Sequence, residues 1–371
     1  MKRILFIVGS LSCGGAEVLL VNYANLLSKY YDVTILTSEN YHNELSSKLN
    51  ANIKCVSIIN TSNYFIFRIL QFIMMKILSY GILIRYLYYV KKIKLDEFDY
   101  VVPFLEGFST NLVKKVNAIK YAWVHTDLID NNWCYKKDKI NEVYKNFNKI
   151  IFVSKGILKK YQLMYPTDNR FIAVHNMLDI DLIKQLSAES TINEYNSLFT
   201  IISVGRLEKV KGYERLLEVA IRLNKEGFLF KIIIIGNGSQ YNYLKNMIVE
   251  NQMEKVICLY GFQENPYKFI NKADLFILPS FVEGLPNVLY EALILEKPVI
   301  ATKNAGSLEV LNNGEYGMIV ENSFNGIYSG LKMVLQSSDE YLKLALKAKK
   351  ASQIVIEENN KIHKWLLNLF Q

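Results

Sequence analysis

The 371-residue sequence is 51% hydrophobic and 21% charged, so it can form two domains with sizeable cores. Its four cysteines are scattered without a C-x-x-C pair, which argues against a disulfide framework or a zinc site and suits a reducing cytoplasm. The net charge of +9 lies in residues 1–180, with 23 Lys and Arg against 14 Asp and Glu, whereas residues 181–371 contain 21 of each. The basic N-terminal half predicts that this part of the protein meets an anionic surface or an anionic substrate. Nucleic acid is not favoured, because the sequence contains no helix-turn-helix, RRM or KH pattern.

Short apolar runs alternate with helical patterns along the whole chain. Runs of this kind separated by helices indicate parallel sheets that are covered on both faces. Two such series in succession predict an α/β fold of two Rossmann-like domains. The strands expected in the first series are residues 2–8, 32–37, 99–103, 121–124, 150–153 and 171–174, and those in the second are 199–204, 230–235, 256–259, 274–278 and 298–301.

The start of the chain imitates a signal peptide, because three residues with two cations precede the apolar run at 4–8. This run is too short for the apolar region of a signal peptide, and Ser10 stands where a lipoprotein signal would need leucine before Cys13. We therefore expect a buried first strand. The turn after it contains Gly14-Gly15-Ala16-Glu17 and lacks G-x-G-x-x-G spacing, which disfavours a dinucleotide-dependent oxidoreductase.

Residues 64–94 are strongly apolar but contain no uncharged stretch near the roughly 20 residues of a membrane span. On a helix, Arg68, Gln71, Lys76 and Ser79 share one polar arc and the other side chains are apolar. Such a helix could lie in the surface of an anionic bilayer, or it could pack on the first sheet with its polar arc in water. Both interpretations stay open, and the basic half slightly favours the membrane.

Two polar residues follow predicted strands in the first half. His125 ends the strand at 121–124, and we expect it to face the cleft between the two domains. A core histidine with a satisfied hydrogen bond is the alternative. Glu106, which follows the strand at 99–103, is a weaker candidate for contact with an acceptor.

The two series join near His175-Asn176-Met177, so we expect a first domain of residues 1–175 and a second of residues 176–353. The sequence contains one D-x-D motif, Asp179-Ile180-Asp181, which is a pattern that can bind a metal. It follows a strand and opens a helix, so helix capping explains it better than metal binding. We expect no metal and no cofactor.

Two cations, Arg206 and Lys211, lie on the loop after the strand at 199–204. Without a metal, side-chain cations and helix N-termini must neutralise a departing diphosphate. Arg206 can bind a phosphate with two hydrogen bonds, and Lys211 supplies a point charge. Two exposed loop cations are the alternative, and the acidic motif downstream favours the functional interpretation.

That motif contains Glu283 and Glu291, separated by seven residues. A tight turn between them leads into a helix expected to begin near Val288, whose N-terminal N–H groups could point at phosphates. Because Glu283 precedes the helix and Glu291 lies one turn inside it, the two cannot sit side by side like the carboxylates of a glycosidase. The candidate donor-binding residues of this segment are Gly284, Asn287, Val288, Leu289 and Glu291.

These segments together resemble the retaining GT-B glycosyltransferases of family 4, and the resemblance runs over most of the chain. It rests on SVGRLEKVKG at residues 203–212, PSFVEGLPNVLYEAL at 279–293, KPVIAT at 297–302 and Gly306. The resemblance implies two Rossmann-like domains facing across a donor cleft. It also implies a final helix, here the pattern at about 354–371, that crosses back to the first domain.

The resemblance also implies roles for individual residues. His125 and Glu283 would contact the donor sugar, and Glu291 would contact the ribose. Gly15 would let the backbone approach the donor phosphate or the acceptor, with a plain turn as the alternative. Asn176-Met177 and Gly236-Asn237-Gly238 depart from the family pattern at loop positions, which leaves the donor sugar open.

The function implied is transfer of a hexose or N-acetylhexosamine from a nucleotide sugar, UDP being the commoner carrier in the family. With no covalent nucleophile assigned, the resemblance implies same-face displacement without metal. A polyprenyl-linked glycan at the inner face of the bacterial plasma membrane is the expected acceptor, in synthesis of capsule, lipopolysaccharide O-antigen or exopolysaccharide. A soluble sugar or sugar-phosphate transferase and a non-catalytic nucleotide-sugar-binding protein stay open as alternatives.

Overall fold

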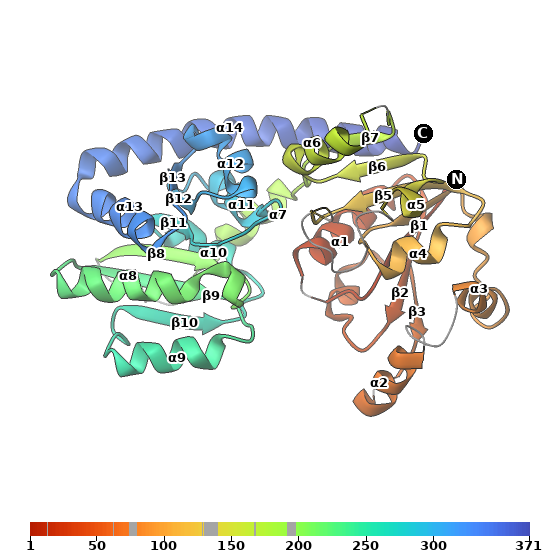
Figure 1. Ribbon diagram of the computed structural model, residues 1–371, viewed down its shortest axis with the longest axis horizontal. Helices are drawn as coiled ribbons and strands as arrows, with labels where there is room; N and C mark the ends of the chain where they lie inside the picture. The colour runs from red at the N-terminus through yellow and green to blue at the C-terminus, as the bar shows by residue number, and fades with distance from the viewer. Residues whose placement is uncertain are drawn as a thin grey trace. The chain divides into compact units, whose positions relative to one another are not determined.

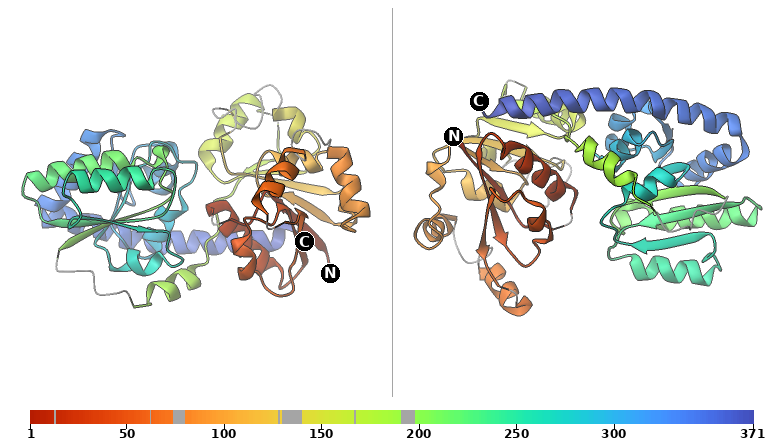
Figure 2. Two further views of the ribbon diagram at one scale, coloured as in Figure 1. Left: turned by 90° about the horizontal axis from the view of Figure 1, so that it is seen from below. Right: turned by 180° about the vertical axis from the view of Figure 1, so that it is seen from behind.

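The computed structural model describes the chain except residues 13, 62, 74–79, 128, 130–139, 167 and 191–197. It divides into two compact units (Figures 1 and 2). The first unit comprises Met1–Met177 and Ile362–Gln371, and the second comprises Leu178–Lys361. Each unit contains one parallel β-sheet with helices on both faces, so the predicted α/β class with two Rossmann-like domains is confirmed.

The sheet of the first unit has seven parallel strands in the order β3-β2-β1-β4-β5-β6-β7. Its strands are β1 (Arg3–Val8), β2 (Asp32–Glu39), β3 (Lys54–Ile59), β4 (Tyr100–Pro103), β5 (Ile119–Val124), β6 (Lys149–Phe152) and β7 (Phe171–Ala173). Its helices are α1 (Gly15–Leu27), α2 (Tyr64–Phe72), α3 (Tyr80–Tyr89), α4 (Phe108–Val113), α5 (Ile140–Tyr144) and α6 (Lys155–Met164), with short 3-10 helices at Glu44–Lys48 and Leu95–Glu97.

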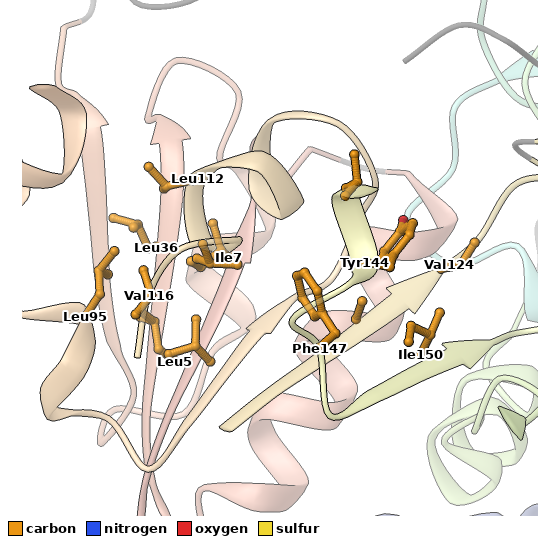
Figure 3. Packing of buried hydrophobic residues seen from close by; sticks show 14 of the residues in the cluster. Leu5, Ile7, Leu36, Leu95, Leu112, Val116, Val124, Tyr144, Phe147 and Ile150 are labelled. Atoms are coloured by element: carbon orange, nitrogen blue, oxygen red, sulfur yellow. The ribbon is translucent and has the colours of Figure 1, made fainter. Parts of the chain in front are cut away.

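Alternate residues of β1 enter the cores on opposite faces of this sheet. Leu5 and Ile7 pack with side chains of α3, α4, α5 and α6, and Figure 3 shows part of this cluster. Phe6 points to the other face, where its ring makes edge-to-face contacts with the rings of Phe104 and Phe370. Because both faces are covered, the strand is an unbroken apolar run, and the sequence alone therefore predicts it.

The second unit has six parallel strands in the order β10-β9-β8-β11-β12-β13. Its strands are β8 (Phe199–Val204), β9 (Phe230–Ile235), β10 (Ile257–Gly261), β11 (Leu275–Leu278), β12 (Val299–Thr302) and β13 (Met318–Val320). Its helices are α7 (Ile180–Ser187), α8 (Tyr213–Lys225), α9 (Tyr241–Glu250), α10 (Tyr267–Lys272), α11 (Asn287–Ile294), α12 (Ala305–Val310), α13 (Phe324–Gln336) and most of α14 (Ser338–Leu369), with 3-10 helices at Lys209–Lys211 and Asn312–Gly314.

Neighbouring residues of β8 divide the second unit into two cores. Ile202 lies in a cluster with side chains from α7, α10, α11 and α14. Ile201 lies in another cluster with side chains from α8, α9 and α13. The sheet is therefore fixed from both sides, and the loops at the carboxyl ends of its strands rest on a rigid base.

Three elements differ from the sequence expectations. Strands β3 and β13 were not predicted, and both are edge strands. Strand β3 begins with an exposed lysine and is interrupted by a serine, and β13 has only three residues, all partly exposed, so neither gives the longer buried apolar run on which the expectation relied. Helix α14 begins at Ser338, sixteen residues before the expected start at 354. Its first half buries a few residues such as Leu344 and Ala348 beside exposed leucines, so its apolar density is low.

The described residues between 64 and 94 include two helices of different character, α2 and α3. In α3, Leu83 and Leu87 are buried in the core, as the packing interpretation predicts. In α2, Phe65 is 73% exposed and Phe72 is 60% exposed. Helix α2 lies beyond the end of β3 in Figure 1 and in the right view of Figure 2. Lys76 and Ser79 lie outside the described residues. None of the helices that the structure describes is long and apolar enough to cross a membrane.

We predict that Gly212→Ala destabilises the protein more than Gly227→Ala. Both glycines have positive φ, +69° and +86°, which costs an alanine about 1 kcal/mol. A Cβ at Gly212 would lie 2.2 Å from the Pro279 carbonyl oxygen, whereas one at Gly227 meets no described atom within 4 Å. Calorimetry should give the larger fall in Tm for Gly212→Ala, and equal falls would contradict this contact.

Candidate functional site

The candidate residues of the second unit lie at one edge of its sheet. Strand β8 pairs with both β9 and β11, so the strand order reverses beside it. The loop after β8 contains Arg206 and Lys211, and the loop after β11 contains Glu283. Because parallel strands present their carboxyl ends at one edge, this reversal brings the two loops together at the place where open α/β sheets bind ligands.

Lys211 and Glu283 form an ion pair across these loops. The Lys211 Nζ lies 2.7 Å from Oε1 and 2.9 Å from Oε2 of Glu283. The Ser280 hydroxyl also donates to Oε1, at 2.6 Å. The side chain of Lys211 is 19% exposed and that of Glu283 is 9% exposed, so water has little access to the ion pair.

Arg206 is exposed and lies two residues after the end of β8. The backbone next to it is well fixed, because Leu207 donates to the Asn237 carbonyl oxygen at 2.9 Å. Gly236 allows this close approach, since a Cβ there would lie 1.9 Å from the Gly205 carbonyl oxygen. The guanidinium is thus an accessible cation on a rigid loop, which suits an anionic ligand.

Helix α11 begins at Asn287, one residue earlier than expected, with Pro286 as its N-cap. The turn before it packs on α12, where a Cβ at Gly306 would lie 2.8 Å from the Gly284 carbonyl oxygen. Within the helix, the Leu289 N–H donates to the Pro286 carbonyl oxygen at 3.1 Å, so this N–H already has a partner inside the turn. Val288 is partly exposed in the same first turn.

Glu291 lies one turn inside α11, as expected, with its carboxyl surrounded by protein. Loss of solvent raises the pKa of this carboxyl to about 7, and a hydrogen bond with the Tyr267 hydroxyl opposes the shift. The same contact raises the pKa of Tyr267, chiefly through the nearby negative charge of Glu291. A carboxyl group with a pKa near 7 can accept hydrogen bonds from ligand hydroxyls once it is ionised.

In the first unit, Gly15 is the first residue of α1 rather than part of the preceding turn. A Cβ at Gly15 would meet no described atom within 4 Å, so no described packing contact demands a glycine there. A Cβ at Gly14 would instead lie 2.1 Å from the Glu17 side chain. The described contacts within the chain therefore do not explain why position 15 is a glycine.

Glu106 is buried and organises the loop after β5. Its Oε1 accepts hydrogen bonds from the N–H groups of His125, at 2.6 Å, and Thr126, at 2.7 Å, and from the Thr126 hydroxyl at 3.2 Å. Burial raises the pKa of this carboxyl, and these hydrogen bonds oppose the shift. Its Oε2 is also buried and has no hydrogen-bond partner among the described residues.

His125 follows β5, as predicted, and its ring lies 5.1 Å from that of Phe104. Burial lowers the pKa of His125 to about 4, and a hydrogen bond to the Phe104 backbone opposes the shift. The imidazole is therefore neutral at pH 7. Its Nε2 has no partner among the described residues, so Nδ1 makes the backbone bond and Nε2 can accept a hydrogen bond from a ligand hydroxyl.

The D-x-D motif caps a helix. Asp179 is the N-cap of α7, and its carboxylate accepts a hydrogen bond from the Leu182 N–H at 3.0 Å. This confirms the capping interpretation. Within the described part of the chain, no group of three His, Cys, Asp or Glu residues could hold a metal ion.

Three residues of these sites were missed by sequence reasoning: Thr126, Tyr267 and Ser280. Thr126 and Ser280 each lie one to three residues from a predicted residue, so proximity in sequence was an available signal. Tyr267 lies on α10, 24 positions before the Glu291 that it contacts, and its local sequence gives no sign of that contact. Only the packing of α10 beside α11 reveals it.

Comparisons with known proteins agree with this architecture. The family model "Glycosyl transferases group 1" matches residues 187–351, which include Arg206, Lys211, Glu283 and Glu291. A TarM variant from Staphylococcus aureus, solved with fondaparinux, alpha-GlcNAc-glycerol and UDP, has a TM-score of 0.76 at 16% identity over 100% of both chains. Anabaena HepE, solved with UDP and glucose, gives 0.77 at 17% identity over 100% of this chain and 99% of that one. The chain has the GT-B fold.

Curated relatives are glycosyltransferases too. An N-acetylgalactosamine-N,N'-diacetylbacillosaminyl-diphospho-undecaprenol 4-alpha-N-acetylgalactosaminyltransferase of Campylobacter jejuni is 31% identical over 59% of this chain and 58% of its own length. A glycosyltransferase of Haemophilus influenzae is 24% identical over 95% of this chain and 96% of its own length. The chain spans little more than half the length of the first two curated relatives that it matches, 58% and 52%.

We predict that Glu291→Gln stabilises the protein more at high pH than at low pH. The carboxyl loses its proton near pH 4.5 in the unfolded chain and near pH 7 in the folded protein. Between these values the folded state binds more protons, so this group lowers stability as pH rises. The Tm difference, variant minus wild type, should become more positive from about pH 5 to about pH 8.

Tyr267→Phe is the matched control for this prediction, because it removes the hydroxyl partner and keeps the Glu291 carboxyl. The pH dependence of its Tm should therefore persist. A Tm difference for Glu291→Gln that stays constant with pH would contradict the raised pKa.

Proposed function

We propose that the chain is a retaining, metal-independent glycosyltransferase that uses a nucleotide-sugar donor, UDP-linked in the first instance. The observation that supports this most is the set of side chains at the strand reversal of the second unit. There a cation, an ion pair and a helix N-terminus gather at one sheet edge, inside the region that the glycosyltransferase family model matches.

In the proposed reaction, the bond between the anomeric carbon and the diphosphate oxygen breaks while the acceptor oxygen bonds to that carbon from the same face. The acceptor hydroxyl gives its proton to the departing diphosphate. Arg206, Lys211 and the first turn of α11 would stabilise the negative charge on the diphosphate. Glu283 and His125 would hold hydroxyls of the donor sugar, Glu291 those of the ribose, and Glu106 a hydroxyl of the acceptor.

We further propose a polyprenyl-linked glycan as the acceptor, in bacterial surface-polysaccharide synthesis. The name of the C. jejuni relative describes transfer to a diphospho-undecaprenol-linked glycan. Other relatives are named for capsular polysaccharide biosynthesis in S. aureus and for colanic acid biosynthesis in Escherichia coli. A free sugar or sugar phosphate is the alternative acceptor.

The proposed location is the inner face of the plasma membrane, with α2 resting on anionic lipid. Residues 64–94 contain six cations and no Asp or Glu. The apolar side chains of α2 that are exposed include Phe65, Ile66, Ile69 and Phe72. Exposed aromatic residues beside cations can insert at the lipid headgroups, and each cation near an anionic surface adds about 1 kcal/mol.

Calorimetric titration with a panel of UDP- and GDP-sugars, without metal, tests the donor proposal. We expect one donor to bind selectively, and Glu283→Ala to reduce at least about tenfold the affinity that the sugar adds to the nucleoside diphosphate, because the sugar loses a charged hydrogen-bond acceptor. Product analysis by NMR should show the anomeric configuration of the donor retained, and EDTA should not change the rate.

Three outcomes would contradict parts of the proposal. An inverted anomer would refute same-face displacement. Loss of rate in EDTA would refute metal independence. Failure of every nucleotide sugar to bind would refute the donor class, and selective binding without any transfer would favour the non-catalytic alternative.

Vesicle flotation tests the membrane proposal. The variant Phe65→Ser/Phe72→Ser should lose most of its binding to vesicles that contain phosphatidylglycerol, because its exposed aromatic area is gone. Leu346→Ser on α14, where the leucine is 68% exposed, is the matched control and should bind like wild type. Undiminished flotation of the double variant would exclude α2 as the contact.

A further inference from the structure

The ion pair between Lys211 and Glu283 joins two residues that are proposed to bind different parts of the donor. Lys211 is assigned to the diphosphate and Glu283 to the sugar, yet the lysine contacts both oxygens of the carboxylate. A diphosphate that takes the lysine must therefore compete with Glu283. The ion pair thus links the two ends of the donor.

The backbone around the pair holds the two loops together. Phe281 donates its N–H to the Val210 carbonyl oxygen at 2.8 Å. The buried Arg215 donates from Nε to the Pro279 carbonyl oxygen at 3.1 Å, and its guanidinium lies 3.7 Å from the centre of the Phe281 ring. These contacts fix Lys211 opposite Glu283, so the pair is a built feature of the fold.

Removal of the lysine would leave Glu283 poorly solvated. Its side chain is 9% exposed, and its remaining described hydrogen bond comes from the Ser280 hydroxyl. Breaking one side of a buried ion pair is strongly unfavourable, because the other charge stays buried without a partner. Sugar hydroxyls can donate to the carboxylate and replace the lysine, whereas a nucleoside diphosphate without a sugar offers no such donor at this position.

We propose that the Lys211–Glu283 pair makes affinity for the nucleoside diphosphate depend on the attached sugar. The intact donor supplies partners to both residues, so it binds without an uncompensated charge. After transfer, the diphosphate holds Lys211 and leaves Glu283 unpaired, so the lysine returns to Glu283 and the diphosphate is released. This inference rests on the proposed function and adds a role for the pair in donor selection and product release.

Calorimetric titration of the full chain with UDP and GDP tests the inference. Glu283→Gln has nearly the same shape but no charge, so Lys211 becomes available to the phosphates. We expect the variant to bind the diphosphate about tenfold more tightly than wild type, while the attached sugar adds much less affinity than in wild type. Glu283→Ala should shift diphosphate affinity in the same direction if the amide variant does not fold.

Two controls isolate the pair. Glu321→Gln removes a carboxylate from the exposed Lys303–Glu321 ion pair of the same unit and should leave both affinities unchanged. In a Lys211→Gln background, Glu283→Gln should no longer tighten diphosphate binding, because no lysine is released.

The outcomes separate this inference from the proposed function. If wild type binds UDP or GDP and neither Glu283 variant binds it more tightly, the inference is overturned and the proposed function stands. A gain that persists in the Lys211→Gln background would also overturn it. If neither nucleoside diphosphates nor nucleotide sugars bind wild type or variants, the proposed function fails, and the inference fails with it.

Discussion

The parallel pairing of β8 with β11 is the constraint on which the candidate site depends. The register sets Ile201 beside Leu275 and Ile202 beside Phe276, so both strands end at the same edge of the sheet. The loops that follow then bring Lys211 and Glu283 into contact across 72 positions of sequence. Helices pack on both faces of the sheet and hold its strands in position. The loops that carry the polar side chains are therefore anchored on a rigid sheet.

Three acidic residues near the sheet edges show how surroundings set the state of a carboxyl group. Glu283 forms an ion pair with Lys211. Glu291 has lost its solvent, so its pKa rises to about 7. Glu106 is buried and has its Oε1 held by backbone N–H groups, with Oε2 left without a described partner. One residue type thus gives an ion-pair partner at position 283, a carboxyl with a raised pKa at 291 and a positioning group at 106, because each meets different hydrogen-bond partners and a different degree of burial.

Helices α2 and α3 illustrate the same dependence for apolar residues. Both come from one apolar stretch of sequence, yet Leu83 and Leu87 enter the core while Phe65 and Phe72 remain exposed. Both segments are strongly apolar, so composition alone does not decide which helix meets the sheet. The exposed rings of α2 therefore form an apolar surface beside a basic stretch of sequence, and this is the surface for which we propose contact with anionic lipid.

The sequence by itself determined the two Rossmann-like domains, most strand positions, the cap at Asp179 and the positions of His125 and Glu283, because apolar runs, caps and loop motifs are local signals. The tertiary structure alone decided the edge strands β3 and β13, the Lys211–Glu283 pair and the contact of Tyr267 with Glu291. Those features depend on strand order and on which helix packs beside which. Pairs of residues brought together by long-range packing leave no periodic pattern in the sequence.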